Sequence, residues 1–141
     1  MAIIVKSKEI IFRHKMTQEN SLTTPSKELL AAGRGLADGL GYLLSIGIVG
    51  RDVKQASQDA ICYGADQVLA IENPALENPQ ADLQLEALTR ICQRSNPDII
   101  LLARTTAGRD LGPRIAARLN VGLAQDCLHL RIDPALKRLI A

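Results

Sequence analysis

The sequence predicts an α/β domain of three layers, in which a parallel β-sheet lies between two layers of helices. Short apolar runs of strand length alternate with segments whose apolar residues recur at helical spacing, and this alternation indicates right-handed crossovers. The runs 42–49 and 98–103 are apolar at successive positions, as in strands covered on both faces. A chain of 141 residues, with 47% hydrophobic and 23% charged residues, suits one globular domain with a sizeable core.

Residues 1–49 contain three predicted strands and one predicted helix. Residues 2–5 predict a strand, and residues 9–14 predict a second one more weakly. A polar loop, 14–25, leads to a helix over 25–40, because Thr24 and Pro25 form a helix start signal. Gly41 is expected to end that helix, since glycine accepts the left-handed conformation of a helix end. The apolar run 42–49 follows as the third strand.

The same alternation continues to the end of the chain. We expect a helix from Asp52 to Gly64, a strand over 68–71, a loop over 73–79, a helix over 82–94 and a strand over 98–103. Pro113 fits only the first turn of a helix without loss of a hydrogen bond, so the fourth helix is expected to be capped near Asp110. Residues 128–132 alternate apolar and polar side chains and predict a strand exposed on one side.

Charge and composition exclude several classes of function. Lys and Arg number 17 and Asp and Glu 15, so a net charge of +2 predicts neither nucleic acid nor an anionic membrane as partner. No apolar run approaches the length of a membrane span. The three cysteines have no CxxC spacing and only two histidines to join them, so we expect no metal site. An odd cysteine count without a secretory signal predicts a cytoplasmic protein with reduced thiols. No catalytic triad is visible.

The most informative loop for chemistry is 104–110, which follows a predicted strand and leads into a helix. Ligands of open parallel sheets bind at the carboxyl ends of the strands, beside helix N-termini. The candidate ligand-binding residues are two hydroxyls, a glycine and a guanidinium: Thr105, Thr106, Gly108 and Arg109. One interpretation is a cradle for an anion or a nucleotide phosphate. The other is a capped helix whose Arg109 pairs with a neighbouring acid or a subunit.

The turn at residues 47–52 and the charged residues of the fourth helix each have a structural and a functional interpretation. Residues 47–52 read as a strand followed by a tight turn, and as GxxG they are weak evidence for a phosphate loop. Asp110, Arg114 and Arg118 recur at i,i+4 spacing, which is typical of a solvated ion-pair stripe and less often of a docking surface.

One segment carries a family resemblance. Residues 105–119 read TTAGRDLGPRIAARL, and residues 122–127 read GLAQDC. Together they resemble the amino-terminal domain of the electron transfer flavoprotein alpha subunit. Residues 27–30, 36–37, 63–66 and 96–98 match the same family in order, so the likeness covers roughly residues 25–133, whereas residues 6–24 do not match its first loop.

The resemblance implies an adenine nucleotide alpha hydrolase-like fold and a place beside a beta subunit in flavin-mediated electron transfer. The family's FAD-binding residues lie mainly in a separate carboxyl-terminal domain, so the resemblance assigns no FAD contact to these residues. In the related beta subunit the corresponding loop region helps to bind AMP, which makes AMP a possible ligand here. We expect residues 1–141 to form a single alpha-type amino-terminal domain, incomplete at its carboxyl end.

Three hypotheses follow. The first is a non-catalytic scaffold in a heterodimer, docked against a beta-like subunit or a separate flavin domain in electron transfer from dehydrogenases. The second is a small adenine-nucleotide-binding protein of the same fold, using Thr105, Thr106, Gly108 and Arg109 for phosphate. The third is a fragment whose bare sheet edges pair in a homodimer.

Overall fold

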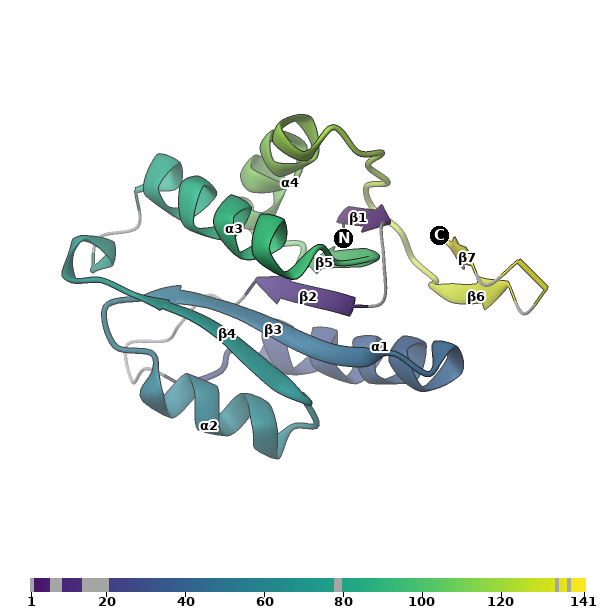
Figure 1. Cartoon of the computed structure of the whole chain (residues 1–141), viewed down its shortest axis with the longest axis horizontal. Helices are drawn as coiled ribbons and strands as arrows, with labels where there is room; N and C mark the ends of the chain where they lie inside the picture. The colour runs from purple at the N-terminus through teal and green to yellow at the C-terminus, as the bar shows by residue number, and fades with distance from the viewer. Residues whose placement is uncertain (1, 6–8, 14–20, 78–79, 134, 137) are drawn as a thin grey trace.

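The computed structural model describes residues 2–5, 9–13, 21–77, 80–133, 135–136 and 138–141, with residues 2–5 and 9–13 described by their backbone (Figure 1). Its main sheet has the order β1-β5-β2-β3-β4. These strands are β1 (Ala2–Val5), β2 (Glu9–Arg13), β3 (Leu43–Gly50), β4 (Gln67–Glu72) and β5 (Ile99–Leu102). The pairs β5–β2, β2–β3 and β3–β4 are parallel, as the sequence predicts.

The edge strand β1 runs antiparallel to β5, with Ala2 opposite Leu102 and Val5 opposite Ile99. The alternation of strands and helices does not predict this orientation. Only residues 6–8 separate β1 from β2, whereas a parallel connection needs a crossover of about a dozen residues or more. The antiparallel direction therefore follows from the short connection.

Two layers of helices cover the sheet, as predicted. Helices α1 (Thr24–Leu40) and α2 (Lys54–Cys62) lie below the sheet in Figure 1, and α3 (Ala81–Ser95) and α4 (Thr106–Leu119) lie above it. Strand β5 divides its side chains between two cores. Ile99 and Leu101 belong to the core under α1 and α2, and Ile100 and Leu102 to the core under α3 and α4. All four are at most 2% exposed, so β5 is buried on both faces.

The helix ends follow from their local sequence. Pro25 lies in the first turn of α1, and Gly41 ends that helix with a φ of 69°. Helices α3 and α4 end at Asn96 and Asn120, whose φ values of 50° and 53° are left-handed, a conformation that asparagine tolerates better than most residues. A short 3₁₀ helix, η1 (Pro74–Leu76), lies in the predicted loop after β4.

The prediction of a strand over 128–132 is wrong in its bounds. The structure has a separate antiparallel hairpin of β6 (Arg131–Asp133) and β7 (Arg138–Ile140), to the right of the sheet in Figure 1. The Asp133 carboxylate accepts hydrogen bonds from the N–H groups of Ala135 and Leu136, so the chain turns immediately after β6. The strand therefore spans only 131–133. Leu128, which the prediction places in the strand, lies outside it and is 89% exposed.

Candidate functional site

The candidate site lies where the order of the parallel strands reverses. From β2 the chain proceeds to β3 and β4 on one side, and it returns to β5 on the other side of β2. In open α/β sheets, ligands bind at such a switch point, beyond the carboxyl ends of the strands. Here two adjoining cavities, of about 340 and 350 Å³, share Leu102, Ala103, Arg104 and Asp126. The first extends toward α4, and the second toward the first turns of α1.

The N-terminus of α4 forms one wall of this cleft. Thr105 caps the helix, because its hydroxyl oxygen accepts a hydrogen bond of 3.1 Å from the Gly108 N–H. A Cβ at Gly108 would lie 2.0 Å from the carbonyl oxygen of Ala103, the residue that follows β5. Thr105 and Gly108 therefore make contacts within the chain: the threonine caps the helix, and the glycine allows the close contact with Ala103.

The prediction that α4 is capped near Asp110 is wrong. The helix begins at Thr106, which places Pro113 inside it. A proline there cannot donate to the carbonyl of Arg109, and this costs the helix one bond. The Thr105 cap and the close packing of Gly108 on Ala103 fix the earlier start in spite of that cost.

The charges of the cleft centre on Asp126, which sequence reasoning does not identify as a site residue. Its carboxylate lies 2.7 Å from Arg104 Nε and 3.8 Å from an Arg109 guanidinium nitrogen. Asp126 adopts a left-handed backbone with a φ of 54°, which is uncommon for a residue other than glycine. In the sequence, Asp126 stands out only as a member of the matched run 122–127. Its pairing with Arg104 cannot be inferred from spacing, since the two residues are distant along the chain.

The four predicted anion-binding residues are thus only partly brought together. Gly108 and Arg109 line the first cavity, with Arg104 and Asp126. Thr105 is the helix cap, and Thr106 is the exposed first residue of α4. An anion in this cleft would compete with the Asp126 carboxylate for both arginines. Pairing of Arg109 with a neighbouring acid agrees with the structural interpretation of this loop, and anion binding stays a prediction.

The second candidate loop, at the end of β3, is a turn held by neighbouring backbone and one ion pair. The Gly50 carbonyl accepts a hydrogen bond of 3.0 Å from the Asn73 N–H, and Arg51 pairs with Glu77. These contacts join β3 to the η1 segment. The turn interpretation therefore accounts for residues 47–52.

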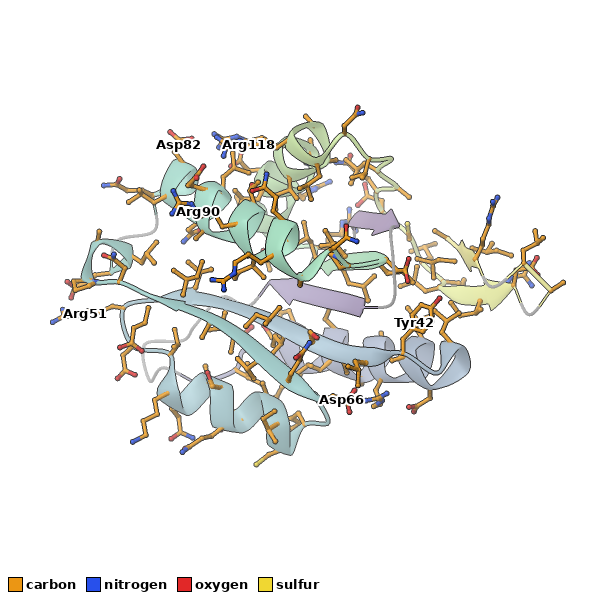
Figure 2. The ribbon with its side chains drawn as sticks, viewed as in Figure 1. Tyr42, Arg51, Asp66, Asp82, Arg90 and Arg118 are labelled. Atoms are coloured by element: carbon orange, nitrogen blue, oxygen red, sulfur yellow. The ribbon has the colours of Figure 1, made fainter. Side chains whose placement is uncertain are left out.

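The arginines of α4 pair with acids of α3. Arg114 pairs with Asp82 and, at 3.4 Å, with Asp110, whereas Arg118 lies 2.8 Å from Glu86. Figure 2 shows Asp82, Arg90 and Arg118 gathered where α3 and α4 lie side by side. Arg90, the i+4 partner of Glu86, lies 2.9 Å from the same carboxyl group. The predicted stripe is an ion-pair cluster between two helices.

This cluster makes a testable contribution to stability. The guanidinium of Arg90, and next that of Arg118, lowers the pKa of Glu86. A lowered folded pKa gives stability that is present above the ordinary glutamate pKa and is lost as the pH falls through the folded value. We expect Glu86→Gln to lower the melting temperature by only about 1–2 °C at pH 7, because the pairs are exposed. Thermal unfolding in about 1 M salt should remove that difference, and a difference unchanged by salt would contradict the assignment.

Neither metal ligation nor a membrane-spanning helix is found in the described part of the chain. There, no three His, Cys, Asp or Glu side chains group closely enough to hold a metal ion. No described helix combines the length and apolar character that crossing a membrane requires.

Fold and cleft together define an α/β protein with the topology of nucleotide- and cofactor-binding domains. Residues 14–141 match the family described as the electron transfer flavoprotein domain. The chain belongs to the electron transfer flavoprotein family.

Curated relatives agree with this assignment. The chain is 37% identical to the electron transfer flavoprotein subunit alpha of Clostridium acetobutylicum over 124 residues, which are 88% of this chain and 37% of the relative. It is 39% identical over 116 residues to the acryloyl-CoA reductase electron transfer subunit beta of Anaerotignum propionicum, covering 82% of this chain and 32% of the relative. It is 38% identical over 111 residues to protein FixB of Bradyrhizobium diazoefficiens, covering 77% and 30%. The chain thus spans about a third of the length of these relatives.

The family is one of flavoproteins, and the cleft does not fit a flavin dinucleotide. A phosphate loop needs glycines that leave room for the ligand. At Gly108 that room is filled by the Ala103 carbonyl, and the adjacent arginines already face Asp126. We therefore assign no step of flavin chemistry to these residues.

Proposed function

We propose that the chain acts as the alpha-type first domain of an electron transfer flavoprotein, a non-catalytic scaffold that docks against a beta-type subunit and a flavin-binding domain. The observation that carries this proposal is the similarity to electron transfer flavoprotein alpha subunits over more than four-fifths of the chain. Thr105 caps α4 and Gly108 closely approaches Ala103, and both contacts support a structural role for the segment with the family resemblance. The two layers of helices that cover the sheet would supply the surfaces for docking.

The proposal predicts a colourless domain that forms a stable complex. Purified alone, the chain should carry no flavin absorption in the visible range. Mixed with a beta-type subunit and the second, flavin-binding domain of an alpha subunit, it should elute with them in size-exclusion chromatography. Stoichiometric flavin on the isolated chain, or separate elution of all components, would contradict the scaffold role.

The runner-up is adenine-nucleotide binding in the same cleft, and one observation favours it. Arg104 and Arg109 together bring two positive charges to the switch point and face one carboxylate. Titration of the isolated chain with AMP and ATP separates the two functions. A calorimetric signal lost in Arg109→Ala but kept in Arg131→Ala, an exposed arginine of β6, would favour nucleotide binding over the scaffold.

A further inference from the structure

Strand β4 forms one edge of the main sheet. Among the described strands it pairs only with β3, from Ser45–Gln67 to Gly50–Glu72. Proteins usually protect such an edge with a proline, an inward charge, a bulge or a very short strand. β4 has six residues, QVLAIE, without proline or lysine, and its polar residues stand only at its two ends. Its outer backbone groups can therefore accept another strand.

A groove runs beside this edge on the α3 side of the sheet. It has a volume of about 650 Å³ and is lined by β4 and by the C-terminal half of α3. Leu69 and Ile71 of β4 are only partly buried there, against the core that includes Ile91. Helix α3 contacts β3 and β2, which lie one and two strands further in than β4. The side of β4 that faces α3 is therefore only half covered. The floor of the groove is apolar.

The wall of the groove that α3 forms is basic. Arg90 and Arg94 of α3 both line it. Arg90 shares Glu86 with Arg118, so two guanidinium groups divide one carboxylate. Within the described part of the chain Arg94 forms no ion pair, although Arg90, Arg114 and Arg118 each do. The groove thus offers positive charge above an apolar floor, beside a strand edge that pairs with no further described strand.

We propose that β4 and this groove bind an extended, acidic segment of a partner protein, which joins the sheet as a strand next to β4 and directs carboxylates toward Arg90 and Arg94. Main-chain hydrogen bonds to the edge would supply affinity, and alternate side chains would supply specificity. The segment needs apolar residues against Leu69 and Ile71 and acidic residues beside α3. This surface is separate from the cleft at the end of β5.

A second copy of the chain fits the groove less well than such a segment. The single acid of β4, Glu72, lies on the opposite face, where its carboxylate accepts a hydrogen bond of 3.4 Å from the Val53 N–H ahead of α2. Pairing two β4 strands would therefore bring two sets of basic groups together without a carboxylate in either groove. Charge complementarity favours a different, acidic partner.

Two synthetic peptides test the proposal with the whole chain. One alternates valine with glutamate over six residues, and the other alternates valine with lysine. We expect only the glutamate peptide to bind in fluorescence anisotropy. In hydrogen-exchange NMR it should slow exchange at the alternate amides of residues 67–72 that point away from β3. Equal binding of both peptides, or protection elsewhere than β4, would overturn the proposal.

Substitutions at Arg94 test the charge of the wall. Arg94→Gln should weaken binding about two- to fivefold, as expected for one partly exposed ion pair, whereas Arg94→Lys should retain most of the affinity. Arg131→Gln on β6 is the matched control and should leave binding unchanged. An unaltered affinity in Arg94→Gln would contradict the role of the basic wall. Sedimentation of the free chain as a dimer with β4 already protected would assign the edge to a second copy instead.

Discussion

Replacing Gly108 with alanine is expected to lower the free energy of unfolding by about 3 kcal/mol, a value typical of severe overpacking. The new Cβ would lie 2.0 Å from the Ala103 carbonyl oxygen and 3.2 Å from the carbonyl carbon. Both are backbone atoms, so no rotation of a side chain can relieve the contact. The first turn of α4 would have to move away from β5, and the bond from the Gly108 N–H to Thr105 would be strained.

Gly35→Ala is the matched control for this substitution. Gly35 also lies in a helix, α1, but it is exposed and a Cβ there meets nothing within 4 Å. Alanine is the better helix former, so this variant should gain about 0.5–1 kcal/mol. Chemical denaturation of the wild type and both variants measures the contrast. Equal effects at the two glycines would mean that Gly108 does not approach Ala103 as closely as described.

The same contact explains why the start of α4 could not be derived from sequence. Pro113 predicts a start near Asp110, and the rule behind that prediction is local to one helix. The actual start depends on a contact between Gly108 of α4 and Ala103, the residue that follows β5. The resemblance rests mainly on residues 105–127, but it does not specify that Thr105 caps α4 and that Gly108 contacts Ala103.

Most of the fold was predictable because burial is encoded locally. The strands β3 and β5 are apolar at successive positions, and they are buried on both faces. The antiparallel direction of β1 and the hairpin of β6 depend instead on connection lengths and on the Asp133 turn. In the site, the pairing of Arg104 and Arg109 with Asp126 joins segments distant in the chain, and no spacing rule connects them.

Asp66 illustrates a motif residue whose role is visible only in three dimensions. It belongs to the matched run 63–66, and it clamps the start of β3 from two directions. Its carboxylate accepts a hydrogen bond of 2.7 Å from the Leu44 N–H, and its own N–H donates to the Leu44 carbonyl at 2.8 Å. The same carboxylate lies 2.8 Å from a guanidinium nitrogen of Arg34 in α1. Figure 2 labels Asp66 just ahead of β4.

Asp66→Ala should therefore destabilise the domain by about 2 kcal/mol, mainly because the N–H of the fully buried Leu44 would lose its partner. Asp66→Asn should cost less, since an amide oxygen can still accept that bond but no longer carries the charge that faces Arg34. Asp38→Asn is the matched control, because Asp38 also pairs with Arg34, at 2.8 Å, yet is far more exposed. It should change the free energy of unfolding by no more than about 0.5 kcal/mol.

The pH dependence of these variants distinguishes the clamp from a simple packing effect. The Leu44 N–H, followed by the Arg34 guanidinium, lowers the pKa of Asp66. The folded state consequently holds this carboxyl group unprotonated at pH values where the unfolded chain binds a proton. The stability that wild type has over Asp66→Asn should be complete above about pH 5 and should disappear as the pH falls through the folded pKa. If denaturation midpoints showed a constant difference across that range, the charge of Asp66 would not be what holds β3 to α1.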